Sequence, residues 1–162
     1  GMTMDGPALH DDPNRTTPIG VLRYAADYLE AANNVDEKMG KKKGYEIISP
    51  IPVYFLVGQS IELALKAFLL SKGVSLRDLR KKYGHDLHSS YRKAKEVGLA
   101  ELVIFTDEEL SAIGWLDNLY SSKQLQYIVT GAKTFPLFSP LQTAASKLVR
   151  AVGKEVGYPP NI

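Results

Sequence analysis

Cysteine is absent from this sequence of 162 residues, and tryptophan occurs once. Without cysteine the chain has no disulfide framework, no thiolate zinc site and no cysteine nucleophile. An excess of one charge is also lacking, because 20 Lys and Arg side chains face 18 Asp and Glu, for a net charge of +2. This balance is far from the basic bias of a dedicated duplex-DNA binder. The composition predicts an ordinary globular protein of a reducing compartment, with the cytoplasm as the default.

The N-terminal segment lacks the apolar core of a signal peptide, since residues 2–15 carry acids, glycine and proline instead. Gly1 before Met2 is typical of the scar that tag removal leaves. We therefore expect residues 1–16 to be a disordered or tag-derived tail, and residues 17–158 to form a single domain.

No membrane span is expected, although the run over residues 50–70 is strongly apolar. Glu62 and Lys66 interrupt this run, and ionisable groups at a bilayer centre cost several kcal/mol each. Its apolar side chains also surround the predicted helix on nearly all sides, which is typical of a helix in the middle of a bundle. The run is predicted to be the buried helix of a soluble protein.

Helical periodicity and helix-start signals recur along the whole chain. The expected N-caps are Thr17, Ser49, Ser75, Asp86, Thr106 with Glu109 in a capping box, and Ser139. No alternation of strands and helices is visible, which excludes a parallel sheet. The sequence predicts an all-α fold, an up-and-down bundle of four to five helices with a short irregular or extended connection near residues 123–138. The helical segments are expected at about 18–38, 50–72, 76–83, 87–97, 107–122 and 140–155.

A narrow polar line interrupts the apolar second helix at Gln59, Glu62 and Lys66. If this line points inward, its charges must be matched with each other or with further polar groups, because isolated buried charges are costly. If it faces solvent instead, Glu62 and Lys66 form a surface i,i+4 pair that contributes only about 0.2–0.5 kcal/mol. Spacing alone favours the surface interpretation.

The second candidate segment is a basic turn that ends in Gly84, His85 and Asp86. His85 is expected at a helix N-terminus, where exposed amides and the helix dipole attract anions such as phosphate. Nearby Arg80, Lys81 and Lys82 add positive charge, arginine holds phosphate bidentately, and histidine can move protons at neutral pH. The simpler alternative is that His85 fixes the turn through a backbone hydrogen bond and that the basic side chains are solvated.

Other chemistries find little support in the sequence. His85 and His88 stand three residues apart without convincing further metal ligands, so neither a metal nor a cofactor is predicted. Glycine-rich phosphate loops and a Gly-x-Ser-x-Gly elbow are missing. Trp115, Tyr120 and Tyr127 are suited to stacking on bases, although aromatics at helical spacing are more often core residues.

Two stretches together resemble the HEPN superfamily of small helical bundles. They are the run from Ile61 to Leu70, in which Glu62-Leu63-Ala64-Leu65-Lys66 is similar to the Glu-x-x-x-Leu-Lys core of many members but one residue shorter, and Lys82-Tyr83-Gly84-His85-Asp86-Leu87. The resemblance is specific over residues 51–90 and weaker over 18–38 and 107–155, where Leu125-Gln126-Tyr127 is similar to a segment that usually carries arginine in the middle.

This resemblance implies a bundle that is usually dimeric and that occurs in toxin–antitoxin and defence systems, beside nucleotidyltransferases. Catalytic members are metal-independent ribonucleases with an Arg-x(4–6)-His motif late in the bundle. In this chain the only histidines are His10, His85 and His88, so no histidine lies late enough. Arg80 and His85 have the permitted spacing but lie in the earlier turn, which weakens the ribonuclease interpretation.

Two functional hypotheses follow. In the first, a homodimeric HEPN-like domain binds RNA or a nucleotide through Glu62, Lys66, Lys82 and Tyr83. If it is a ribonuclease, His85 acts as general acid and base, Arg80 holds the phosphate, and Glu62 orients Lys66. In the second, the domain is a non-catalytic interaction module with a structural Glu62–Lys66 pair and a turn-locking His85. A nucleotidyltransferase-type antitoxin is a possible partner under either hypothesis.

Overall fold

The structure is a computed structural model that describes residues 12–84, 86–122 and 135–162. Within these ranges the chain forms helices and no strand, which confirms the predicted all-α bundle. The helices lie close to their expected bounds: α1 (Pro18–Met39), α2 (Ile51–Ser71), α3 (Leu76–Lys81), α4 (Leu87–Glu96), a short 3-10 helix (Leu99–Glu101), α5 (Asp107–Ser121) and α6 (Phe138–Val156). Most of the connection expected near residues 123–138 lies outside the described residues.

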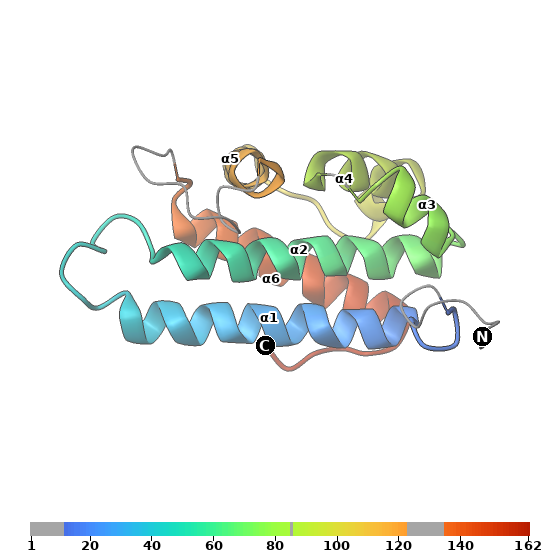
Figure 1. The fold of residues 1–162 in the computed structure, drawn as a ribbon, viewed down its shortest axis with the longest axis horizontal. Coiled ribbons are helices and arrows are strands. Elements are labelled where there is room, and N and C mark those ends of the chain that lie inside the picture. Colours follow the sequence, from blue (N-terminus) through green and yellow to red (C-terminus); the bar gives the residue numbers. More distant parts are fainter. Residues whose placement is uncertain (1–11, 85, 123–134) are drawn as a thin grey trace, which may run out of the picture.

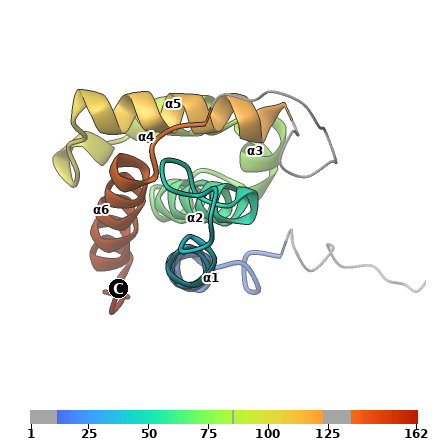
Figure 2. The same ribbon diagram turned by 90° about the vertical axis from the view of Figure 1, so that its left-hand side faces the viewer.

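Helix α2 is the centre of the bundle and packs against every other α-helix of the described chain. Figure 1 shows α1 and α2 as a long antiparallel pair, with α6 behind them. Figure 2, in which this pair is seen end-on, shows α5 running across the top of the bundle. The 21 residues of α2 are apolar enough to cross a bilayer, yet 61% of the most apolar stretch is buried inside the bundle. This burial is that of a core helix, as predicted.

Four of the expected N-caps are confirmed. The Thr17 hydroxyl accepts from the Gly20 amide at 3.1 Å, and the Asp86 carboxylate accepts from the Ser89 amide at 2.6 Å. The Ser75 hydroxyl accepts from the Asp78 amide at 3.1 Å. Thr106 and Glu109 form the reciprocal capping box. Each such cap satisfies amides that have no partner inside the helix.

The caps expected at Ser49 and Ser139 are wrong. The N-cap of α2 is Pro50, and the Ser49 hydroxyl donates instead to the carboxylate of Asp36 on α1. Helix α6 begins at Phe138, so Ser139 already lies inside its first turn, and neither N-cap makes a side-chain bond. A serine before a proline therefore marked both helix starts without capping either helix.

Gly58 allows α5 to approach α2 closely. A Cβ atom at this position would lie 2.5 Å from the Cδ1 atom of Tyr120, so the aromatic ring occupies the space that any larger residue would need. Tyr120 is 6% exposed and lies at the end of α5. This contact brings its hydroxyl group, which needs a hydrogen-bond partner when buried, onto the polar line of α2.

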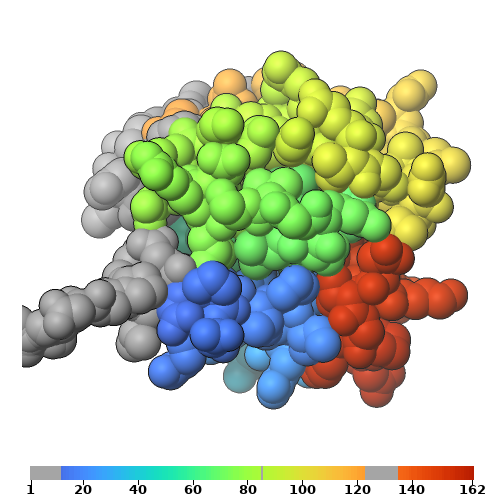
Figure 3. Space-filling model, turned by 90° about the vertical axis from the view of Figure 1, so that its right-hand side faces the viewer, coloured from blue at the N-terminus to red at the C-terminus, as the bar shows by residue number. Residues whose placement is uncertain are grey.

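Helices α3 and α4 cover one end of α2. Figure 3 shows this end of the molecule, where α3 and α4 lie above the start of α1, with the last turns of α2 between them. The segment is basic, because residues 76–97 hold seven Lys and Arg against three Asp and Glu, whereas the whole chain has a net charge of only +2. The fold therefore places a cationic cover beside the polar line of α2.

Candidate functional site: a cavity between α2, α3 and α4

A cavity of about 250 Å³ lies where α3, α4 and the turn between them meet α2. It collects four residues that the sequence singled out, namely Glu62 and Lys66 on α2, Arg80 on α3, and Tyr83 in the turn. The remaining lining residues are Leu63, Leu76, Leu79, Gly84 and Ser90. Residues from three helices and the turn thus form one pocket with apolar walls and a few polar groups, the usual composition of a ligand site.

Lys66 is partly buried on the wall of this cavity and has no carboxylate partner. Across the described parts of the chain, no Asp or Glu oxygen lies within 4.0 Å of its Nζ atom. The predicted Glu62–Lys66 ion pair is therefore not formed, although the two residues are one helical turn apart. A cation in a pocket without a counter-ion strongly favours an anionic ligand, because an unmatched charge is costly to desolvate.

The carboxylate of Glu62 is held by α5 instead. The Tyr120 hydroxyl donates to its Oε2 atom at 2.8 Å, and Gln59 Nε2 donates to the same hydroxyl oxygen. Burial, and then the charge of Glu62, raise the pKa of Tyr120 far above its ordinary value. The hydroxyl group therefore stays protonated and remains a hydrogen-bond donor to Glu62 at any physiological pH.

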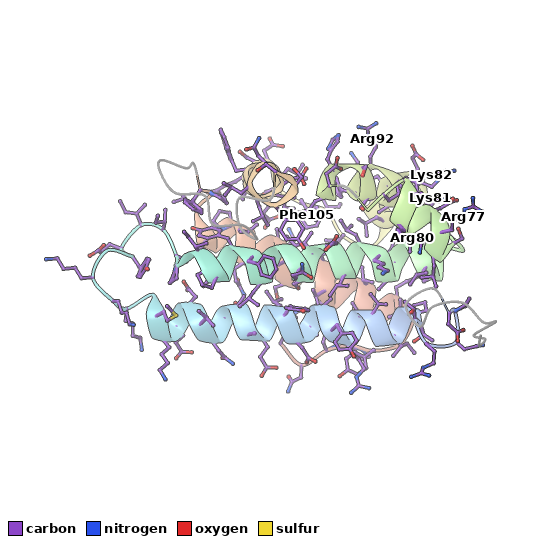
Figure 4. The ribbon with its side chains drawn as sticks, in the orientation of Figure 1. Arg77, Arg80, Lys81, Lys82, Arg92 and Phe105 are labelled. Atoms are coloured by element: carbon purple, nitrogen blue, oxygen red, sulfur yellow. The ribbon has the colours of Figure 1, made fainter. Side chains whose placement is uncertain are left out.

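Arg80 and Lys82 take different positions although they lie close together on α3 and its C-cap. Arg80 lines the cavity, whereas Lys82 does not and forms an exposed i,i+4 pair with Asp78 at 3.7 Å. Figure 4 shows Lys82 on the outer face of the molecule, with Arg77 and Lys81. The structure therefore brings Arg80 to the predicted site and leaves Lys82 at the surface.

His85 lies outside the described residues, so its predicted role stays a prediction. The turn on either side of it is firmly held. The Ser90 hydroxyl donates to the Tyr83 carbonyl oxygen at 2.6 Å. Gly84 packs against the end of α3, where a Cβ atom would lie 2.8 Å from the Arg80 carbonyl oxygen, so a larger residue would force the turn away from α3.

The anion site expected at the start of α4 is wrong, because carboxylates of the chain itself already occupy its amides. Asp117 on α5 accepts from the Leu87 amide at 2.7 Å and from the His88 amide at 3.3 Å. The next amide, that of Ser89, donates to Asp86. Three of the first-turn amides are thus satisfied, and an external phosphate would have to displace Asp117 or Asp86.

Burial raises the pKa of Asp117, and the nearby charge of Asp86 raises it further, against the lowering effect of the Leu87 amide. The two carboxylates share one helix N-terminus, whose dipole stabilises negative charge. Asp117 therefore connects α5 to the turn beside the cavity, as Tyr120 connects α5 to Glu62. The two residues are three apart and lie on one face of α5.

A second cavity, of about 410 Å³, also has Lys66 in its lining. It shares Leu63 and Lys66 with the first cavity, and its other charged residues are Arg15, Arg23 and Asp27. Lys66 thus lines two cavities.

The remaining sequence candidates contribute no further site. Trp115 is 50% exposed rather than a core residue, Tyr120 is buried, and Tyr127 lies outside the described residues together with Leu125 and Gln126. Within the described ranges, no group of three or more His, Asp or Glu residues is placed to hold a metal ion.

Sequence reasoning missed three residues that shape the cavity, namely Asp117, Tyr120 in its polar role, and Ser90. The one available signal was the spacing of Asp117 and Tyr120 on a single face of α5. Nothing in the pattern linked them to Leu87 and Glu62, which are 30 and 58 residues away in the sequence.

Comparison with known proteins leaves the question of family open. No family model, no curated protein and no solved structure matches this chain. The function must therefore be inferred from the cavity itself.

Proposed function

We propose that the chain binds a phosphate-bearing ligand, RNA or a nucleotide, in the cavity between α2, α3 and α4. The observation that carries this proposal is Lys66, a partly buried cation on the cavity wall with no carboxylate within 4.0 Å in the described chain. Arg80, on α3, adds to the lining a guanidinium group that can hold phosphate bidentately.

Glu62 can bind the sugar or the base of such a ligand. Tyr120 donates to its Oε2 atom and fixes its orientation, while a carboxylate can accept several hydrogen bonds at once. A ribose hydroxyl or a base amino group is a matching donor. Lys66 and Arg80 then neutralise the phosphate, while Glu62 accepts a hydrogen bond from the ribose or the base of a nucleotide.

The experiment compares binding of AMP and of a short single-stranded oligouridylate to the wild type and to Lys66→Met, which keeps the length of the side chain and removes its charge. We expect the variant to bind about tenfold more weakly, because a charged hydrogen bond of about 1.5 kcal/mol is lost.

Lys42→Met is the matched control, because Lys42 is exposed in the loop between α1 and α2, at the far end of the pair from α3. It removes the same charge and should leave binding unchanged. If both variants bind the ligands equally more weakly than the wild type, only the net charge of the protein matters. If Lys66→Met binds them as tightly as the wild type, the proposed site is wrong.

The catalytic form of the proposal is a metal-independent ribonuclease. In it, His85 moves the proton of the ribose 2′-hydroxyl and Arg80 stabilises the charge that develops on the phosphate. Cleavage of single-stranded RNA in EDTA by the wild type, and its loss in His85→Ala, is the expected result. Negligible cleavage by both proteins would remove the catalytic step and leave the binding site.

A second candidate function, a non-catalytic interaction module, is favoured by the way the chain satisfies its own polar groups. Asp117 and Asp86 occupy the start of α4, and Tyr120 holds Glu62. On this account His85 only fixes the turn. His85→Ala would then lower the melting temperature without changing the binding of RNA or nucleotide.

The wider setting is proposed on the resemblance alone. A HEPN-like domain would act in the cytoplasm as a homodimer, with a nucleotidyltransferase-type antitoxin as partner. The molar mass in solution, measured by light scattering, tests the dimer. Co-purification with the product of an adjacent nucleotidyltransferase gene tests the partner.

A further inference from the structure

A separate cavity, of about 420 Å³, lies between α4 and α5. Figure 1 shows α4 lengthwise and α5 end-on, so the two helices run in different directions, and the cavity lies in the corner between them. The size is that of a small-molecule site. It shares no lining residue with the cavity of the proposed function and is independent of it.

The floor of this cavity is apolar. Leu87 is buried, Ile113 and Tyr91 are partly buried, and Leu110 is 37% exposed at the edge. Tyr91 packs against Phe105, with the two ring centroids 5.9 Å apart. The corner therefore offers an apolar surface for a hydrocarbon or aromatic group.

The rim of the cavity is cationic. Arg92 and Lys95, on α4, form no ion pair with any carboxylate of the described chain. The Lys95 ammonium lies 5.0 Å from the centre of the Tyr91 ring. Asp117 is the one acid in the lining, and its two oxygens already accept from the Leu87 and His88 amides.

We propose that this corner is a binding site for a small organic anion with an apolar body, whose acid group pairs with Arg92 and Lys95 while its body lies on Tyr91, Leu110 and Ile113. A compact corner with an apolar floor and a cationic rim complements both parts of such a molecule. A purely inorganic anion would leave the floor unused, and a neutral amphiphile would leave the cations unpaired.

Gly114 provides a sharp test, because it lines the cavity and an added Cβ atom would meet no heavy atom within 4 Å. Gly114→Leu should therefore fill the corner while improving the helical propensity of α5. This variant blocks the site without removing a charge. Loss of binding in a protein that is at least as stable as the wild type would not be caused by unfolding.

The probe is sodium octanoate, followed by amide NMR shifts, with octylammonium and acetate as matched controls. We expect octanoate to saturate and to shift the resonances of residues 87–95 and 110–117, while neither control saturates. The double variant Arg92→Gln/Lys95→Gln should bind octanoate about tenfold more weakly, because two partly exposed charge pairs are lost. Gly114→Leu should not bind octanoate.

Three results would overturn the proposal: equal binding of octylammonium, octanoate shifts confined to other helices, or unchanged octanoate binding by Gly114→Leu. Vesicles of phosphatidylglycerol distinguish a free anion from a membrane surface. If these vesicles broaden the same resonances while octanoate has no effect, the cationic rim serves a membrane and the small-molecule site is wrong.

Discussion

Two partly buried lysines of this bundle have opposite surroundings. Lys147 on α6 donates to Glu109 at 2.7 Å, and that carboxylate side chain is 7% exposed. Lys66 on α2 lines a cavity and has no carboxylate within 4.0 Å in the described chain. The first lysine is matched inside the fold and holds α5 to α6. Lys66 has no such carboxylate partner among the described residues. Lys147 is therefore a structural cation, whereas Lys66 is available to a ligand.

The largest expected effect comes from breaking the matched pair. Lys147→Met leaves Glu109 buried without its counter-ion, so the free energy of unfolding should fall by about 2–3 kcal/mol. The fall is smaller than for a fully buried pair because the lysine is partly exposed. Urea denaturation measures this change in the free energy of unfolding.

Lys72→Met is the control for this variant, since its pair with Glu155 is about one third exposed on each side. Lys72→Met should lower the free energy of unfolding by less than about 1 kcal/mol. Equal losses in the two variants would contradict the structural role given to the Lys147–Glu109 pair.

A smaller fall in the free energy of unfolding is expected when the hydroxyl group of Tyr120 is removed. Tyr120→Phe leaves Glu62 and Gln59 without their shared partner, at a cost of about 1–2 kcal/mol in the free energy of unfolding. Tyr24→Phe, at a position that is 65% exposed, serves as the control and should have no effect. If Tyr120→Phe is as stable as the wild type, α5 does not hold Glu62 in solution.

Acid should weaken the matched pair. Burial acts to raise the pKa of Glu109, but hydrogen bonds from Lys147 and from Thr106 outweigh it, so the net pKa is lowered from 4.5. Because the folded state holds this proton less tightly, the stabilisation is fully present above about pH 4.5 and is lost as the pH falls through the lowered value. The stability of the wild type relative to Glu109→Gln, about 1 kcal/mol at neutral pH, should therefore shrink in acid. A difference that grows in acid would reverse this account.

The smallest expected change in stability is that of Lys66→Met. No ion pair is lost, and the new side chain can pack against Leu63 and Leu79 in the cavity, so the free energy of unfolding should change by less than about 0.5 kcal/mol. Calorimetry checks this value. A loss as large as that of Lys147→Met would show that Lys66 has a structural partner after all.

The sequence predicted the local part of this molecule well. Helix bounds and the caps at Thr17, Asp86 and Thr106 follow from side chains a few residues from their partners. The sequence also allowed the prediction that Lys66 and Arg80 lie near one site. Only residues 72–75 separate α2 from α3, so α3 must return along the end of α2. Short connections and periodicity carry this information.

The hydrogen-bond partners of the buried polar groups could not be predicted from the sequence. Periodicity indicates which face of a helix is polar, but it does not tell which distant side chain that face will meet. Glu62 therefore seemed to need Lys66, one turn away, whereas the fold supplies Tyr120. The start of α4 seemed open to phosphate because Asp117, 30 residues later, gave no sign that it would occupy those amides. Both errors arise from contacts between helices far apart in the sequence.

The most direct test labels every lysine with ¹³C-methyl groups, which keep the positive charge, and follows their NMR signals during titration with oligouridylate. Assignment rests on the Lys66→Met and Lys147→Met variants. The account predicts that the Lys66 signal shifts and saturates with the ligand while the Lys147 signal stays in place. A Lys66 signal that does not move while other lysines respond would contradict it.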